Sequence, residues 1–160
     1  MNERYIRQTM IPGIGEAGQE KLKNAKVLIV GIGGLGSPIS LYLTAAGVGQ
    51  IGLIDDDIVS KSNLQRQILY TEAEIGQSKV ECACRRLSAL NSSTRFETYP
   101  NRFTPDNANR LVSAYDIIVD GCDNAATRYL IDDVCSRFKK PYVYGSISEF
   151  RGQVSVFNYR

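Results

Sequence analysis

The chain has 160 residues, of which 43% are apolar and 22% charged, and a net charge of +2. This composition fits one compact globular domain, and a charge so near neutrality argues against nucleic acids and anionic membranes as partners. No apolar run approaches the roughly 18 residues that a membrane span requires, and the polar start "MNERYIRQ" is unlike a secretory signal.

Strand-like and helix-like periods alternate along the chain. The pattern predicts strands at 26–32, 50–55, 94–100, 115–121, 141–148 and 152–159, and helices at 35–48, 76–90, 105–114 and 126–138. This order predicts an α/β fold, a doubly wound, mostly parallel Rossmann-like sheet with helices on both faces, in one domain over residues 1–160. Ligands of such sheets bind beyond the carboxyl ends of the strands, so we expect the chemistry just after each apolar run.

The first apolar strand ends in the glycine-rich turn "GIGGLG". Gly31, Gly33 and Gly36 fit the spacing G-x-G-x-x-G, which allows a tight turn, a close approach of the backbone to phosphate, and packing of the helix on the strand. The next helix would present unpaired N–H groups to that phosphate. The alternative is a strand-to-helix turn that binds no ligand.

Carboxylates gather at the end of the second strand. Asp55 lies where a carboxylate can accept hydrogen bonds from the ribose hydroxyls of either NAD or ATP. Asp56 and Asp57 follow, and three adjacent carboxylates are poor neighbours for a phosphate unless a cation lies between them. A solvated acidic turn is the alternative reading of Asp56 and Asp57.

Polar and basic side chains follow in "SNLQRQ" and "GQSK". Asn63, Arg66 and Gln67 lie in a polar stretch, where Asn63 and Arg66 would share one face of a helical turn and the arginine fork suits phosphate oxygens. Lys79 lies in the first turn of a predicted helix, where an ammonium opposes the helix dipole, so its position indicates a nearby anion. Solvated surface is the alternative for each basic side chain.

The segment "DGCDNAATR" follows the strand at 115–121. Asp123 either binds Mg²⁺ at the strand end or caps the next helix, and Cys122 reads most simply as a small buried hydrophobe. A nicotinamide enzyme needs neither two cations nor a magnesium carboxylate, whereas cleavage of a triphosphate needs both. Arg66, Lys79 and Asp123 together therefore favour ATP with Mg²⁺ over an NAD(P)-dependent dehydrogenase.

The chain has no histidine, and its four cysteines form no C-x-x-C pair. We therefore expect no zinc site in this chain, and catalytic sites of the Ser-His-Asp and Cys-His types are excluded. Scattered cysteines without a secretory signal indicate reduced thiols and a cytoplasmic location.

The motifs "RYIRQ", "GIGGLG", "LIDDD", "SNLQRQ", "GQSKVE" and "GCDN", in this order and spacing, resemble those of the ThiF/MoeB/HesA family. These proteins are bacterial relatives of ubiquitin-activating enzymes. The resemblance runs from residue 4 to the end of the chain. It implies ATP-dependent adenylation of the C-terminal glycine of a ubiquitin-like sulfur-carrier protein ending in Gly-Gly, with release of pyrophosphate.

The resemblance also implies roles for individual residues. Asp55 would bind ribose and Asp123 would carry Mg²⁺, whereas Arg7 would reach into the site of a partner subunit, because the family acts as dimers. The phosphates would be lined by Gly31, Gly33, Gly34 and Gly36. The triphosphate would be held by Asn63, Arg66 and Lys79, and the expected nucleotide-binding set also includes Asp57 and Gln67.

The chain departs from the family pattern after "VSVFNYR". Family members usually continue with zinc-binding C-x-x-C pairs and carrier-docking surface, so we expect this chain to be the adenylation core, as a fragment or a short homologue. Thioester and persulfide steps are assigned to none of its cysteines, and the sulfur pathway is not specified. The alternative function is a non-catalytic nucleotide-binding half of an activating enzyme.

Overall fold

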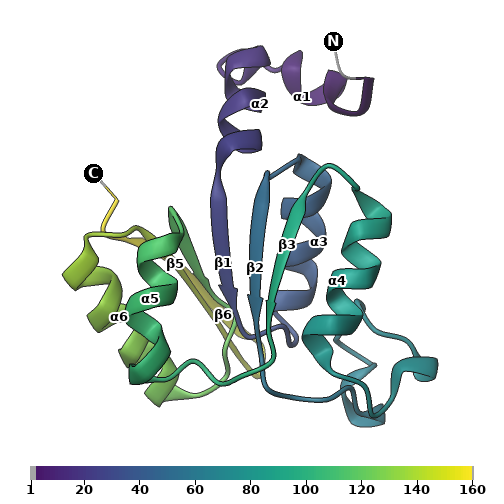
Figure 1. Cartoon of the computed structure of the whole chain (residues 1–160), viewed down its shortest axis with the longest axis vertical. Helices are drawn as coiled ribbons and strands as arrows, with labels where there is room; N and C mark the ends of the chain where they lie inside the picture. The colour runs from purple at the N-terminus through teal and green to yellow at the C-terminus, as the bar shows by residue number, and fades with distance from the viewer. Residues whose placement is uncertain (1–2, 160) are drawn as a thin grey trace.

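A computed structural model of the chain describes residues 3–159. Within them, six strands form one sheet in the order β3-β2-β1-β4-β5-β6 (Figure 1). The strands are β1 (Lys26–Val30), β2 (Gln50–Ile54), β3 (Arg95–Tyr99), β4 (Ile117–Asp120), β5 (Tyr142–Ser148) and β6 (Arg151–Phe157). Neighbours from β3 to β5 are parallel, and the edge strand β6 is antiparallel to β5. The predicted doubly wound, mostly parallel sheet is confirmed.

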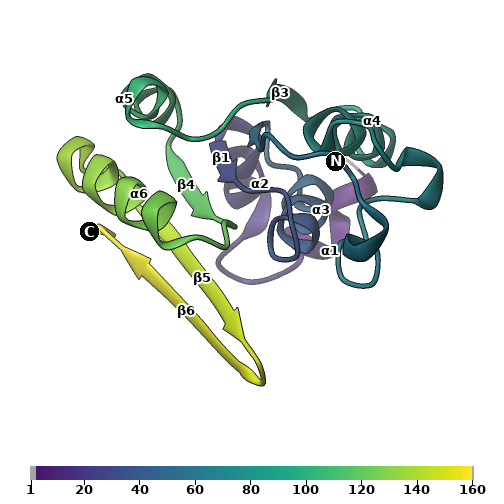
Figure 2. The same cartoon turned by 90° about the horizontal axis from the view of Figure 1, so that it is seen from below.

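Helices cover both faces of the sheet. The helices are α1 (Ile6–Thr9), α2 (Gly15–Asn24), α3 (Gly36–Ala46), α4 (Lys79–Leu90), α5 (Pro105–Ala114) and α6 (Ala125–Phe138), and the 3₁₀ turns are η1 (Glu3–Tyr5), η2 (Lys61–Asn63) and η3 (Glu72–Glu74). α3 and α4 lie on one face, and α5 and α6 on the other (Figures 1 and 2). Every predicted strand and helix is found, with ends shifted by up to three residues.

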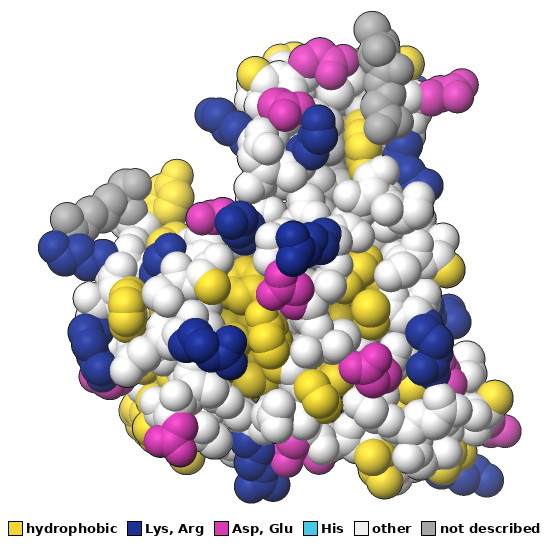
Figure 3. All heavy atoms as spheres, in the orientation of Figure 1, with side chains coloured by type: hydrophobic (Ala, Val, Ile, Leu, Met, Phe, Trp, Pro, Cys, Tyr) yellow, Lys and Arg dark blue, Asp and Glu magenta, His cyan; other side chains and the backbone are white. Residues whose placement is uncertain are grey.

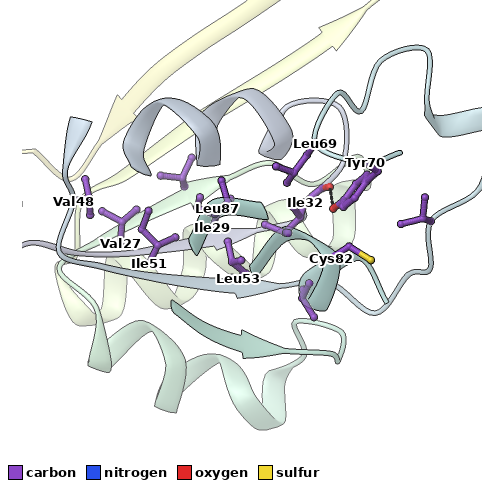
Figure 4. Close-up of a cluster of buried hydrophobic side chains, with 14 residues drawn as sticks. Val27, Ile29, Ile32, Val48, Ile51, Leu53, Leu69, Tyr70, Cys82 and Leu87 are labelled. Carbon is purple, nitrogen blue, oxygen red and sulfur yellow. Dashed lines mark hydrogen bonds between the residues drawn. The ribbon is translucent and has the colours of Figure 1, made fainter. Parts of the chain in front are cut away.

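Each face of the sheet has its own buried core, because successive residues of a strand point to opposite faces. Val27 and Ile29 of β1 pack with Leu87 of α4 in the core drawn in Figure 4. Leu28 and Val30 belong to the second core, under α5 and α6. Since both faces of the central strands are buried, their sequences are apolar at nearly every position rather than alternating.

The N-terminal segment lies at the end of the sheet opposite the carboxyl ends of the parallel strands (Figure 1). Gln8 Nε2 donates a hydrogen bond to the Ala46 carbonyl oxygen (3.1 Å), and Asn91 Nδ2 donates one to the buried Tyr5 hydroxyl (2.8 Å). The sequence does not predict α2, because this helix buries only Gln19 and so has no apolar stripe.

The hairpin of β5 and β6 extends away from the body of the molecule (Figure 2). Every residue of β6 is exposed, and Phe150 at the tip of the hairpin is fully in solvent. On the face shown in Figure 3, apolar side chains gather near the centre, and charges of both signs surround them. Among residues 3–159, no helix is long and apolar enough to cross a bilayer.

Candidate active site

A cleft of about 910 Å³ opens at the carboxyl ends of β1, β2 and β4. Its volume lies in the range of small-molecule sites. The fold brings together here residues that are distant in sequence, because parallel strands end at the same edge of the sheet. The predicted site residues that line it are Gly31, Gly33, Gly34, Asp55, Asp57, Arg66, Gln67, Lys79 and Asp123. Those outside its lining are Arg7, Gly36 and Asn63.

Two glycines of the turn allow close approaches of backbone to backbone. Gly31 has φ of +87°, and a Cβ there would lie 2.9 Å from the Gly121 carbonyl group of the neighbouring strand end. A Cβ on Gly36 would lie 2.1 Å from the Gly31 carbonyl oxygen. Both positions therefore require glycine for the fold itself, which agrees with the predicted tight turn and helix packing.

The other two glycines face the cleft. A Cβ on Gly33 would meet only Gln67 Nε2, at 3.5 Å, and the three atoms nearest to one on Gly34 belong to the Arg66 side chain, the first at 3.7 Å. Within residues 3–159, the N–H groups of Gly33, Gly34 and Leu35 make no hydrogen bond, and Leu35 gives α3 no side-chain cap. Unpaired N–H groups at a helix N-terminus form a cradle for an anion, so this turn fits phosphate.

Asp55 connects the glycine turn to the acidic segment that follows it. Its Oδ2 accepts a hydrogen bond from the Ile32 N–H (2.7 Å), and its Oδ1 accepts one from the Asp57 N–H (2.9 Å). Each oxygen keeps a lone pair that can accept a bond from a ribose hydroxyl. One carboxylate oxygen from each of Asp55, Asp56 and Asp57 lies within 4.8 Å of the other two.

Cations offset two of these carboxylates. Lys79, which is only 4% exposed, donates from Nζ to Asp57 Oδ2 at 2.8 Å. Arg102 Nε donates to Asp56 Oδ2 at 2.7 Å, and Arg102 also lines the cleft. Arg102 is not among the residues predicted from sequence, although it comes three residues after β3 and polar residues are expected to line the site just after each strand.

The segment "SNLQRQ" supplies one exposed cation and one buried amide. Arg66 lies on the cleft and donates from Nη1 to the Ser62 carbonyl oxygen (3.1 Å). Gln67 is 4% exposed, and its buried Oε1 has no hydrogen-bond partner among the described residues. Asn63 belongs to η2, and its carbonyl oxygen accepts from the N–H groups of Arg66 and Gln67, so its position shapes the turn. Its predicted contact with triphosphate stays a prediction.

Asp123 is exposed on the cleft and, among residues 3–159, makes no hydrogen bond or ion pair. The alternative role of helix cap is wrong, because the N-cap residue of α6 is Asn124, whose Oδ1 accepts from the Thr127 N–H at 2.9 Å. The carboxylate of Asp123 is therefore available to a cation. Arg7 is exposed on α1, at the far end of the sheet from the cleft (Figure 1).

Partly buried Arg128, which contacts the residues just before Asp123, was not predicted from sequence. Arg128 Nη2 donates to the Cys122 carbonyl oxygen (2.8 Å), its Nη1 donates to the Tyr144 hydroxyl (2.9 Å), and its Nε lies 3.9 Å from Asp120 Oδ2. Burial raises the pKa of the Asp120 carboxyl, and burial with the Asp120 contact raises the pKa of the Cys122 thiol to about 12. Cys122 therefore stays a protonated thiol, in agreement with its prediction as a buried hydrophobe.

Comparison with known proteins identifies the family. The ThiF family model matches residues 5–160. The chain belongs to the ThiF family. This confirms the resemblance drawn from the motifs.

Within this family, the chain is 48% identical over 157 residues to the sulfur carrier protein adenylyltransferase of Thermus thermophilus, covering 98% of this chain and 58% of that protein. It is 51% identical over 154 residues to the probable adenylyltransferase/sulfurtransferase MoeZ of Mycobacterium tuberculosis, covering 96% and 39%. The chain thus spans only part of the length of these curated relatives, 58% of the first and 39% of the second.

Solved structures share the fold. E. coli MccB in its crystal structure with ATP superimposes with a TM-score of 0.82 at 32% identity, over 91% of this chain and 45% of MccB. E. coli tRNA N6-threonylcarbamoyladenosine dehydratase, TcdA, in complex with AMP gives a TM-score of 0.77 at 32% identity, over 80% of this chain and 52% of TcdA.

Proposed function

We propose that the chain binds ATP in this cleft and transfers AMP to the C-terminal glycine carboxylate of a ubiquitin-like sulfur-carrier protein ending in Gly-Gly. One observation carries the proposal: a glycine turn without a side-chain cap, the two cations Arg66 and Lys79, and the Asp123 carboxylate, which has no partner among residues 3–159, meet in one cleft. The names of the curated relatives support the adenylation, and the ATP and AMP complexes of MccB and TcdA support an adenine nucleotide as ligand.

In this proposal the cleft residues bind and orient ATP. Asp55 accepts hydrogen bonds from the ribose, and the N–H groups of Gly33 and Gly34 donate to phosphate oxygens. Arg66 and Lys79 stabilise the negative charge that develops on the triphosphate. The carrier carboxylate attacks the α-phosphorus, so that an O–P bond forms, the bond from that phosphorus to pyrophosphate breaks, and pyrophosphate leaves with the electron pair. No nucleophile from this chain is needed.

Asp123 fits a magnesium ion better than the acidic cluster at residues 55–57 does. Its carboxylate is unpaired among the described residues, whereas Asp56 and Asp57 already pair with Arg102 and Lys79. A bound Mg²⁺ would supply charge neutralisation on the phosphates. Asp123 is therefore the residue that we propose to hold it.

The proposal extends to a homodimer with Arg7 acting in trans. Arg7 is exposed and lies at the opposite end of the sheet from its own cleft, so within one chain it is remote from the nucleotide. In a homodimer of suitable geometry, the same side chain can enter the partner's cleft.

We further propose that the adenylation domain extends over the whole chain. The four free thiols support the cytoplasm as the location of the protein.

Exchange of labelled pyrophosphate into ATP tests the function. The chain is mixed with Mg²⁺, ATP and each of a panel of carriers ending in Gly-Gly, and we expect exchange that requires one of these carriers. A carrier truncated by its last glycine and the variant Lys79→Met should both abolish it. ATP binding without exchange with any carrier would favour the non-catalytic half instead, and NAD binding in place of ATP would favour the dehydrogenase.

A further inference from the structure

We propose that Asp57 is a positioning residue, which holds the Lys79 ammonium in the cleft and does not itself contact the nucleotide. The proposal rests on the proposed binding of ATP by Lys79 and assigns a different role to Asp57, which the sequence predicts to be a nucleotide contact. It also makes Asp55 the link between this ion pair and the glycine turn.

Two hydrogen bonds fix Lys79 to Asp57. The Lys79 N–H donates to the Asp57 carbonyl oxygen at 3.0 Å, and Lys79 Nζ donates to Asp57 Oδ2 at 2.8 Å. The lysine side chain is 4% exposed, whereas that of Asp57 is 65% exposed. One oxygen of the Asp57 carboxylate therefore contacts the buried ammonium, and much of the rest of this side chain is exposed to water.

This pairing explains how a buried lysine is tolerated at the start of α4. Lys79 is the first residue of the helix, where an ammonium meets the positive end of the helix dipole. A buried ammonium without a partner would also be strongly unfavourable. The Asp57 carboxylate offsets both effects, so the position of Lys79 depends on that of Asp57.

Asp57 is in turn fixed to the phosphate cradle. Its N–H donates to Asp55 Oδ1 (2.9 Å), and Asp55 Oδ2 accepts from the Ile32 N–H inside the glycine turn (2.7 Å). A short antiparallel bridge between Ile58 and Ser78 holds the segment that follows Asp57 against the start of α4. Hydrogen bonds therefore run without a break from the glycine turn through two carboxylates to Lys79, and set the distance between the cradle and the cation.

The competing role for Asp57 is direct contact with a ligand, as part of the acidic cluster at residues 55–57, in which one oxygen from each carboxylate lies within 4.8 Å of the other two. The two roles predict different results when Lys79 is absent. If Asp57 only positions Lys79, removing its carboxylate should no longer affect ATP binding once Lys79 is absent. If Asp57 contacts the nucleotide directly, removing its carboxylate should still weaken binding.

The first test measures the reactivity of Lys79 without nucleotide. The chain is treated with an amine-acylating reagent, and modification of Lys79 is followed by mass spectrometry in wild type, Asp57→Asn and Asp56→Asn. We expect Asp57→Asn to accelerate the modification roughly tenfold, the factor for losing a hydrogen bond between charged groups. Asp56→Asn removes the same charge one residue away and should leave the rate at that of wild type. Equal rates in wild type and Asp57→Asn would overturn the proposal.

The second test is a double-mutant cycle on Mg²⁺–ATP binding, with wild type, Asp57→Asn, Lys79→Met and the double variant. We expect Asp57→Asn to weaken binding roughly ten- to a hundredfold alone, and to change it by less than about twofold when Lys79 is already methionine. Equal losses in both backgrounds would establish direct contact and overturn the proposal.

One outcome separates this proposal from the proposed function. A wild-type chain that binds no ATP would refute the function, while the labelling experiment would still decide the role of Asp57. If Asp57→Asn does not fold, Asp57→Ser takes its place with the same expectations, since a small polar side chain suits this exposed position.

Discussion

Replacing Gly36 by alanine should destabilise the fold, whereas the same change at Gly33 should spare the fold and weaken nucleotide binding. A Cβ on Gly36 would lie 2.1 Å from the Gly31 carbonyl oxygen. Carbon and oxygen in contact are usually separated by about 3.3 Å or more, so α3 and the glycine turn must separate by roughly 1 Å. A Cβ on Gly33 meets only Gln67 Nε2, at an ordinary 3.5 Å, and occupies space beside the free N–H groups.

The two substitutions should therefore differ in how much they change the free energy of unfolding and the affinity for ATP. Overpacking usually costs roughly 1–3 kcal/mol, and a clash between two backbone segments belongs at the upper end or beyond. For a chain of this size, each 1 kcal/mol shifts Tm by roughly 2–4 °C, so Gly36→Ala should lower Tm by roughly 6–12 °C. Gly33→Ala should change the free energy of unfolding by less than about 1 kcal/mol and weaken ATP binding about tenfold or more, the loss of one charged hydrogen bond.

Urea denaturation gives the free energies of unfolding, and calorimetric titration with Mg²⁺–ATP gives the binding constants. Gly152→Ala is the matched control, because its Cβ would meet only the Ser146 carbonyl oxygen at 3.8 Å, and we expect it to change neither quantity. Wild-type stability of Gly36→Ala would refute the close approach of helix and turn. Wild-type ATP affinity of Gly33→Ala would refute the reading of this turn as a phosphate cradle.

Four further predictions follow from single contacts. Asp123→Asn should keep the Tm of wild type in thermal melts, because Asp123 is not the cap of α6, while Mg²⁺-dependent pyrophosphate exchange falls by orders of magnitude; unchanged exchange would contradict the metal role. Asn124→Ala, which removes the real cap, should cost about 1 kcal/mol in urea denaturation. Mixing an Arg7→Ala chain with a Lys79→Ala chain should restore exchange to about a quarter of wild type if subunits assort at random, and no recovery despite subunit exchange would refute the trans role. Burial raises the pKa of the Cys135 thiol from 9.0 to about 12, so unfolding releases a proton in this window and stability should fall as pH rises from 9 towards 12, less steeply in Cys135→Ala.

The sequence predicts the sheet well because its central strands are buried on both faces. Runs such as "KVLIV" in β1 and "QIGLI" in β2 are apolar throughout, and the helices between the strands show the usual spacing of apolar residues. α2 escapes prediction because it buries only Gln19, and a helix without an apolar stripe leaves no periodic signal. The antiparallel direction of the exposed edge strand β6 is set by its pairing with β5, and the pattern of residues within β6 does not reveal it.

The site is predicted in outline for a topological reason. Parallel strands end at one edge, so polar residues after each apolar run had to meet, and nine of the predicted residues do line the cleft. Their partners depend on side-chain geometry that no spacing rule contains. Three contacts join segments that are distant in the chain: Lys79 with Asp57, Arg102 with Asp56, and Arg128 with Tyr144.

The choice of cap shows a different limit of sequence reasoning. Asp123 and Asn124 are adjacent and both are good N-cap residues, so propensity alone does not separate them. The structure gives the cap to Asn124 and leaves the Asp123 carboxylate facing the cleft. The helix could have begun one residue earlier, and which of the two adjacent residues is the N-cap decides which side chain is available to a cation.

Calorimetric titration of the wild-type chain and of Lys79→Met with Mg²⁺–ATP and with NAD tests the central claim most directly. We expect wild type to bind Mg²⁺–ATP, Lys79→Met to bind it at least about tenfold more weakly, and neither protein to give a heat of binding with NAD. Binding of NAD by wild type with no response to ATP would contradict it.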